Sequence, residues 1–208
     1  MERLRILKII KSVDKEKDTI IENIPQDYID VYCFIHEQYL ILGKKIVDDS
    51  LFKFVFRKYY MIRISAQVSE PFFTGLADFT LTDSDKFEEK VREVLHKLKL
   101  RKDKSGEFKM EYSYGSKLLH TVNNKYPIYD SQVRKALGLK EPYGTTPEEK
   151  IESFFSVYNE IKQSYEYIIK NNSLEMIIEE LKAKRDISKL RDNPVKVLDF
   201  IFWAKGRI

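Results

Sequence analysis

Apolar residues return every three or four positions through much of this chain, the spacing that places them on one face of an α-helix. The clearest run follows Thr146, which has the features of an N-cap, with proline at the first helical position and Glu149 completing a capping box. One apolar stripe then continues through Ile151, Phe154, Tyr158, Ile161, Tyr165 and Ile168. The pattern predicts a long helix that ends at the Asn171-Asn172 pair.

Two shorter helices are predicted after this one. Ser173 stands where it would cap the first of them, whose inward positions are Leu174, Ile177, Ile178 and Leu181. Asn193 and Pro194 open the second, and Gly206 is its expected end. The apolar positions of that last helix are Val197, Leu198, Ile201 and Phe202.

The first half of the chain is less uniform. A segment from Pro25 to about Gly43 carries Ile29, Tyr32, Cys33, Tyr39 and Leu40 on one helical face. Another helix is predicted after residues 82–85, with Phe87, Val91, Val94, Leu95 and Leu98 inward. Residues 51–68 fit two patterns, because Phe52, Phe54 and Phe56 alternate as in a strand while Leu51, Val55, Tyr59 and Ile62 have helical spacing. A helix is the favoured interpretation there, and a small strand region is the alternative.

Helices with short connections and no internal repeat predict an all-α or mainly α fold. At 208 residues the chain is long enough to bury one substantial core and only slightly longer than a usual single domain. We expect a single mainly helical domain over residues 1–208, packed like a bundle of two lobes. The lobes would be residues 1–100 and 107–208, on either side of a linker-like run at 101–106.

The distribution of cysteine and of apolar runs indicates the compartment. Cys33 is the single cysteine and cannot form an internal disulfide. Charged residues interrupt the N-terminus before a stretch long enough for a signal peptide, and no run approaches the roughly 18 consecutive apolar residues of a membrane span. We expect a cytoplasmic protein without membrane contact.

Positive charge is concentrated in one part of the chain. Residues 95–140 contain 11 Lys or Arg and 4 Asp or Glu, an excess of seven positive charges, whereas the whole chain carries +4. Tyrosines are interleaved with these charges, a composition typical of surfaces that hold phosphates and stack bases. An ordinary solvated helix end followed by a loop is the alternative interpretation.

The most unusual segment spans residues 114–137. A glycine turn is predicted at Gly115, followed by a short apolar helix that carries Lys117 and then by a polar loop. Pro127 leads from this loop to Asp130 at the start of the next helix.

This segment resembles the helix-hairpin-helix superfamily of DNA glycosylases, including its 8-oxoguanine glycosylase-like branch. In those enzymes a glycine-rich hairpin presents a nucleophilic lysine, and a later segment of the Pro-x-x-Asp-x-x-Val type presents an essential aspartate. The resemblance implies that Lys117 is the lysine and Asp130 the aspartate, with Pro127, Val133 and Arg134 completing the pattern. Gly115 alone stands for the usual pair of glycines, and the lysine and aspartate are 13 positions apart, fewer than the family usually has.

The resemblance also implies a mechanism. Asp130 would stabilise the positive charge that develops at the sugar's anomeric carbon as the base leaves. Lys117 would attack that carbon as a neutral amine, which requires its pKa to fall by about three units from the ordinary value near 10.4. The target base would have to leave the duplex, with aromatic faces replacing its lost stacking. The candidate substrate-binding residues are Gly115, Ser116, His120, Tyr114, Tyr126, Tyr129, Arg134 and Lys135.

Each of these residues also has a purely structural interpretation. Asp130 stands where an N-cap is needed, and lysines such as Lys117 are solvated in most proteins. His120 would either touch a substrate or pack, and His36 is expected as a hydrogen-bonded core residue.

Other chemistry is not indicated. The scattered histidines and the single cysteine show no metal-ligand spacing, so no metal site is expected. Phosphate loops, nucleophile elbows and dinucleotide fingerprints are missing from the sequence, so no nucleotide cofactor is expected either.

The leading hypothesis is a DNA-binding base-excision protein, a DNA N-glycosylase with AP lyase activity that acts on a damaged base through Lys117 and Asp130. The alternative hypothesis is a non-catalytic module that binds nucleic acid or a protein partner on the same helical scaffold.

Overall fold

The computed structural model describes residues 2–61, 66–78, 87–98, 112–190 and 192–208. These residues form eleven α-helices and contain no strand, which confirms the all-α fold class. The helices are α1 Glu2–Lys15, α2 Lys17–Glu22, α3 Gln26–Leu42, α4 Ser50–Tyr59, α5 Ala66–Asp78, α6 Phe87–Leu98, α7 Tyr112–Val122, α8 Ser131–Ala136, α9 Pro147–Lys170, α10 Glu175–Lys184 and α11 Pro194–Lys205. Two 3-10 helices, η1 Gly43–Val47 and η3 Ser188–Leu190, follow α3 and α10.

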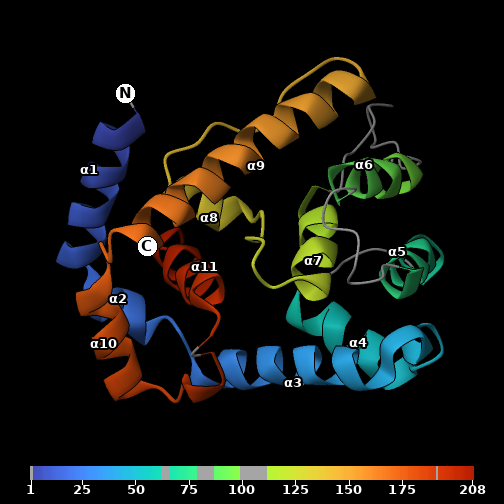
Figure 1. Ribbon diagram of the computed structural model, residues 1–208, viewed down its shortest axis with the longest axis horizontal. Coiled ribbons are helices and arrows are strands. Elements are labelled where there is room, and N and C mark those ends of the chain that lie inside the picture. The colour runs from blue at the N-terminus through green and yellow to red at the C-terminus, as the bar shows by residue number, and fades with distance from the viewer. Residues whose placement is uncertain (1, 62–65, 79–86, 99–111, 191) are drawn as a thin grey trace.

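The helices enclose a centre that contains α7, α8 and α11 (Figure 1). In this view α3 runs along the lower edge, α9 crosses the upper half, and α5 and α6 lie to the right. The N-terminal helices α1 and α2 lie on the left beside α10, close to the C-terminus. Segments from the two ends of the sequence therefore share one side of the molecule.

Buried apolar side chains form two clusters. The larger one joins the N-terminal helices to the C-terminal ones and includes Ile6, Ile20 and Phe202. The smaller one contains Phe52 and Phe56 of α4 together with Leu118 of α7. Both clusters combine side chains from before and after residues 101–106, the run expected as a linker, which itself lies outside the described residues. The division into lobes at that run stays a prediction.

The long helix α9 begins as predicted. The Thr146 side chain accepts a hydrogen bond from Glu149 N, and the Glu149 carboxylate accepts one from the Thr146 backbone N–H, so the capping box is confirmed. Its stop at the asparagine pair is also confirmed. Asn172 adopts a left-handed φ of 47°, which lets the chain turn back on the last carbonyls of the helix.

That turn explains why one predicted cap is wrong. Ser173 N donates to Ile168 O at 3.0 Å, and Asn172 N donates to Ile169 O, the two bonds of a Schellman motif. Ser173 therefore closes α9 instead of opening the next helix, and α10 starts after Leu174 without a side-chain cap.

The other predicted boundaries are confirmed in large part. Helix α3 follows Pro25 and ends at Gly43, although Leu40, expected on the buried face, is 59% exposed. Helix α11 has Asn193 as its N-cap, with the side chain accepting from Lys196 N, and Gly206 as its C-cap. The predicted helix after residues 82–85 is α6, with Val91 and Leu95 buried.

The ambiguous stretch at 51–68 is helical where it is described. Residues 51–59 belong to α4, so the strand alternative is wrong there. Phe52 and Phe56 are buried and Phe54 is 59% exposed, which is the spacing of a helical face. The three phenylalanines alternate only because the exposed face of this helix also carries an aromatic residue, Phe54. Residues 62–65 lie outside the described part of the chain.

The predicted glycine turn at Gly115 is also wrong, because Gly115 lies inside α7. A Cβ at this position would lie 3.2 Å from side-chain atoms of Val91 and of Leu95. The glycine therefore lets α7 pack closely against α6. A glycine that serves close helix packing and a glycine in a turn look the same in a sequence pattern.

Candidate functional site

A small cavity lies where α7, α8 and α11 meet the beginning of α3 and the end of α4. We call it the central cavity. Its volume is about 70 Å³, and a water molecule occupies about 30 Å³ in the liquid, so it holds roughly two waters. Its lining residues are Tyr28, Tyr59, Tyr60, Met61, Lys117, Ile128, Asp130, Val133, Lys196, Asp199, Phe200 and Trp203.

Lys117 extends from α7 into the wall of the central cavity. The residue is 7% exposed, and its Nζ donates a hydrogen bond of 3.2 Å to Tyr60 O. The same atom lies 5.3 Å from the centre of the Tyr60 ring. This lysine is not a solvated surface charge, because its ammonium is held by a carbonyl and an aromatic face.

Asp130 reaches the same cavity from the start of α8. Its side chain accepts a hydrogen bond of 2.8 Å from Gln132 N and so caps the helix, as the structural interpretation of this residue requires. It also lines the central cavity. Capping and cavity lining coexist, because the bond to Gln132 N occupies only part of the carboxylate's capacity to accept hydrogen bonds.

Two further charged residues of the central cavity come from α11. Lys196 and Asp199 are 4% and 3% exposed and lie one helical turn apart. Asp199 accepts hydrogen bonds from Tyr165 OH at 3.0 Å and from Ile128 N at 3.2 Å. Lys196 Nζ lies 4.5 Å from the ring centres of both Tyr32 and Phe200.

Burial dominates the electrostatics of this pair. It raises the pKa of Asp199 to about 7, even though Lys196 and the hydrogen bonds from Tyr165 and Ile128 favour the charged form. It lowers the pKa of Lys196 to about 8, against the attraction of Asp199 and Asp130. Both groups therefore exchange protons near neutral pH, which is the range useful for acid–base chemistry.

The sequence analysis missed Lys196 and Asp199. Their signal was present, because α11 is apolar on all sides apart from these two positions and its ends. A helix of that kind is buried, and opposite charges three positions apart within it are then forced into the interior together. A charge count by segment overlooks such a pair, since its net charge is zero.

His120 anchors α7 beside the central cavity. It is fully buried, and its Nδ1 lies 2.6 Å from Tyr126 O while its Nε2 lies 2.8 Å from Tyr32 OH. A carbonyl can only accept, so Nδ1 carries the proton and Nε2 accepts from the Tyr32 hydroxyl. Asn193 Nδ2 in turn donates to Tyr32 OH at 3.1 Å. Burial lowers the pKa of His120 well below its ordinary value, which keeps the imidazole neutral in this chain of bonds.

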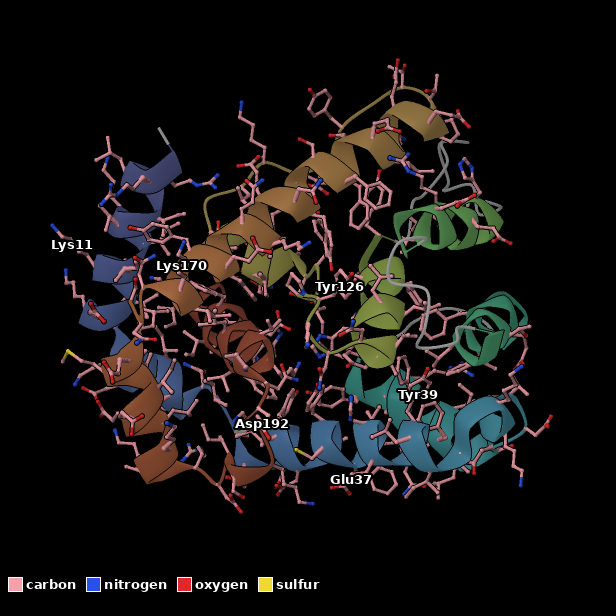
Figure 2. All side chains as sticks on the ribbon, in the orientation of Figure 1. Lys11, Glu37, Tyr39, Tyr126, Lys170 and Asp192 are labelled. Carbon is pink, nitrogen blue, oxygen red and sulfur yellow. The ribbon has the colours of Figure 1, made fainter. Side chains whose placement is uncertain are left out.

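The remaining residues predicted to bind substrate are placed away from the central cavity. The ring of Tyr114 packs edge-on against Phe72. Tyr129 packs on Phe154, and burial raises its pKa to about 12. Tyr126 lies in the connection between α7 and α8 (Figure 2). Lys162 Nζ lies 5.6 Å from its ring centre.

Ser116 and Arg134 have structural partners as well. The Ser116 side chain is buried, and its hydroxyl lies within hydrogen-bond distance of two backbone carbonyl oxygens that it can donate to, Ser113 O and Tyr129 O. Arg134 Nη1 donates to Leu139 O at 2.9 Å. Lys135 is exposed and lines a different hollow, described below. The residues closest to Lys117 in sequence are thus not those closest to it in the cavity.

The aromatic wall of the central cavity comes from other helices. Tyr28 of α3 lies between Trp203 of α11 and Tyr59 of α4, with ring centres 5.3 and 5.9 Å apart. The buried hydroxyl of Tyr60 has no hydrogen-bond partner among the described residues. Met61, at the same edge, has a φ of 49°, an uncommon backbone conformation for a residue other than glycine.

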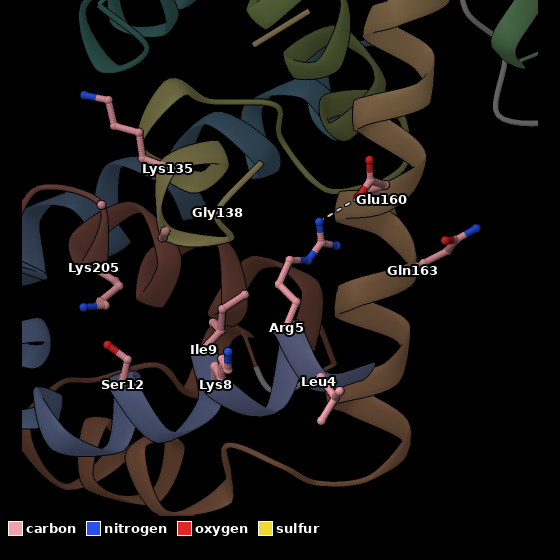
Figure 3. Close-up of a pocket in the computed structure, with 12 residues that line it drawn as sticks. Leu4, Arg5, Lys8, Ile9, Ser12, Lys135, Gly138, Glu160, Gln163 and Lys205 are labelled. Carbon is pink, nitrogen blue, oxygen red and sulfur yellow. Dashed lines mark hydrogen bonds and ion pairs between the residues drawn. The ribbon is translucent and has the colours of Figure 1, made fainter. Parts of the chain in front are cut away.

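A larger hollow lies on the surface between α1, α8 and α9. We call it the α1–α8 groove; its volume is about 980 Å³. Arg5 crosses it to form an ion pair of 2.7 Å with Glu160, and Lys135 and Lys205 lie along its other side (Figure 3). Lys205 is itself paired with Glu16. The groove is therefore a mixed-charge surface.

Much of the basic segment at 95–140 falls on residues whose side chains the structure does not describe. Among its described members, Lys117 is buried, whereas Lys125, Lys135 and Lys140 are exposed. The prediction of a phosphate-binding surface therefore rests on a few described lysines and stays a prediction.

Among the described residues, no group of three or more His, Cys, Asp or Glu side chains is arranged to hold a metal ion. None of the described helices combines the length and apolar character that crossing a bilayer requires. Comparison of the chain with family models, with curated proteins and with solved structures finds no match.

Proposed function

We propose that this protein excises damaged bases from DNA, as a glycosylase with lyase activity whose Lys117 and Asp130 act on the sugar at the central cavity. The observation that carries this proposal is that both residues line one cavity, although they come from different helices.

Asp130 has the position that charge stabilisation requires. Its carboxylate accepts one backbone hydrogen bond and still faces the cavity. Positive charge that develops on a sugar held there would be stabilised by this fixed negative charge. Preorganised groups of this kind contribute a few kcal/mol, or about 10²–10³ in rate.

Lys117 supplies the amine. The apolar residues Leu118 and Leu119 follow it in α7 and are fully buried, so its ammonium lies in a setting with little water. Attack on the sugar requires loss of the ammonium proton and of the hydrogen bond to Tyr60 O. A substrate oxygen that replaced Tyr60 O as acceptor would draw the amine toward the reacting carbon.

The volume of the cavity limits what enters it without rearrangement. Space for about two waters is far less than a purine needs, so a flipped base would have to displace the wall formed by Tyr28, Met61 and Trp203. An abasic sugar needs less volume than a flipped base, because it carries no base. The lyase step on abasic DNA is therefore the first reaction to test.

A second candidate function is favoured by the same small volume and by the bonds that Lys117 and Asp130 already make. In that case the scaffold binds nucleic acid or a protein partner without catalysis, and the two residues only stabilise the fold. Both candidates predict binding that weakens with salt if DNA is the partner. Only the enzyme predicts a covalent intermediate.

The distinguishing experiment is borohydride trapping on a duplex that contains one abasic site. Wild-type protein should form a covalent complex, and Lys117→Gln should abolish it while DNA affinity stays within about threefold. Lys125→Gln is the matched control, because Lys125 is exposed and lies outside the cavity. Asp130→Asn preserves a good N-cap and, on a duplex that carries a damaged base, should slow base release by about 10²-fold or more.

The substrate panel should include oxidised, alkylated and deaminated bases as well as the abasic site. Absence of both base release and a trapped complex across this panel would refute the enzyme. Retained, salt-dependent DNA binding under those conditions would support the binding module.

A further inference from the structure

We propose that Lys196 is a second reactive amine of the central cavity, which condenses with a small aldehyde to give a Schiff base. This inference requires neither Lys117 nor DNA, and it assigns to α11 a chemical role that the proposed function does not use.

The position of Lys196 carries the inference. Its side chain is 4% exposed and lines the central cavity. Its Nζ forms no hydrogen bond and no ion pair within the described part of the chain; its near neighbours are the rings of Tyr32 and Phe200. A buried lysine normally has oxygen partners for its three donors, and here those donors are left for whatever occupies the central cavity, water or a bound carbonyl compound.

Opposing effects act on its proton. The two rings favour the ammonium, and Asp199 and Asp130 favour it through space. Burial outweighs them and lowers the pKa to about 8. Lys196 is also the third residue of α11, where the positive end of the helix dipole disfavours a cation.

Burial lowers the pKa of Lys196 to about 8, so its amine loses its proton more readily near neutral pH than that of an exposed lysine with the ordinary pKa of about 10.5. Lys117 differs in its contacts, because its Nζ donates a hydrogen bond to Tyr60 O. The two lysines of the cavity thus suit different tasks.

The reaction needs no oxidant or reductant. The lone pair of the neutral amine forms a C–N bond as the π bond of the carbonyl breaks, and the oxygen takes up a proton. The nitrogen then loses a proton, the hydroxyl is protonated and leaves as water, and the C=N bond forms. Asp199, one turn away in the same cavity, exchanges protons near pH 7 and can donate the proton that the departing water requires.

Several groups face Lys196 and will shape the pH dependence of this reaction. Asp199 is on its own helix, Asp130 is at the start of α8, and Cys33 and Tyr32 are on α3. From α7 come Lys117, which shares the cavity, and His120, whose pKa is lowered by burial and, to a smaller extent, by Lys196. At the end of α4 Tyr60 shares the cavity wall.

The test is competitive reductive alkylation of the wild-type protein with limiting acetaldehyde and sodium cyanoborohydride, followed by peptide mass spectrometry. Lys196 should be ethylated at least tenfold faster at pH 7 than the exposed Lys140 and Lys170, and the ratio should shrink as the pH is raised toward 10. Lys117→Gln should leave the fast reaction at Lys196 intact. Lys196→Arg should remove it, but the wild-type measurement decides the matter without that variant.

Reaction at Lys196 no faster than at the exposed lysines, or fast reaction at Lys117 alone, would overturn the inference. The outcome is separable from that of the trapping experiment. A protein that traps abasic DNA through Lys117 and leaves Lys196 unmodified contradicts this inference alone. A protein that ethylates rapidly at Lys196 and never traps DNA contradicts only the glycosylase.

Discussion

Removal of one hydroxyl group, in Tyr32→Phe, should destabilise this protein more than the same change at another buried tyrosine. The Tyr32 hydroxyl joins three helices, because it donates to His120 Nε2 on α7 and accepts from Asn193 Nδ2 at the N-cap of α11. Phenylalanine keeps the ring and its packing and leaves both partners buried without a bond. The matched control is Tyr158→Phe, since Tyr158 OH makes one bond, to Pro127 O.

The magnitude follows from the number of groups left unsatisfied. Each buried donor or acceptor that loses its partner costs about 1–3 kcal/mol. Tyr32→Phe leaves two such groups and should cost about 2–6 kcal/mol, and Tyr158→Phe leaves one and should cost about 1–3 kcal/mol. Both tyrosines are nearly fully buried, at 3% and 4% exposed, so a difference in solvent exposure cannot account for the contrast.

Urea denaturation followed by circular dichroism measures both values. The midpoint of Tyr32→Phe should fall further than that of Tyr158→Phe, with the same slope, because the surface exposed on unfolding is nearly unchanged. A cost of Tyr32→Phe equal to or below that of Tyr158→Phe would show that His120 and Asn193 find other partners, and the proposed anchoring of α7 would be wrong.

Two further predictions concern pH and packing. Because burial raises the pKa of Asp199 to about 7, the folded protein retains a proton that the unfolded chain releases near pH 3.8; the resulting stabilisation is present at low pH and lost as the pH rises through 7. Asp199→Asn removes this term, so its stability relative to wild type should increase from pH 4 to pH 7 in urea titrations, and parallel pH profiles would contradict this. Gly206→Ala should cost about 1–3 kcal/mol by thermal denaturation, since its Cβ would lie 2.1 Å from the backbone oxygen of Gln132. Gly115→Ala should cost less, because it meets only movable side-chain atoms, those of Leu95 among them, and gains helix propensity; equal costs would contradict the packing argument.

Local signals were sufficient for most of the helices. The capping box at Thr146 and the Asn193-Pro194 start depend on side chains within one turn of the helix, so sequence spacing reveals them. The predicted role of Ser173 as an N-cap is wrong because that role does not depend on residue type alone. Its role depends on the left-handed conformation of Asn172, which a pattern of residue types does not disclose.

The candidate site was predictable only in part. The resemblance selected Lys117 and Asp130, and they do share a cavity. The other lining residues, such as Lys196 and Trp203, are far away in sequence and reach the cavity because α11 packs against α8 and α2. The tyrosines near Lys117 in sequence, such as Tyr114 and Tyr129, are therefore core residues and do not line the cavity.

The pairing of the first helices with the last has a consequence for biosynthesis. Residues of α2 pack against α11, and Lys205 reaches back to Glu16. At roughly 5–20 residues per second, the ribosome needs about 10–40 s to produce α11 after α2. During that interval Ile20 and Ile21, fully buried in the finished protein, are without their final neighbours. The nascent chain is therefore expected to depend on chaperones that shield its N-terminal helices, and slow translation should increase its aggregation.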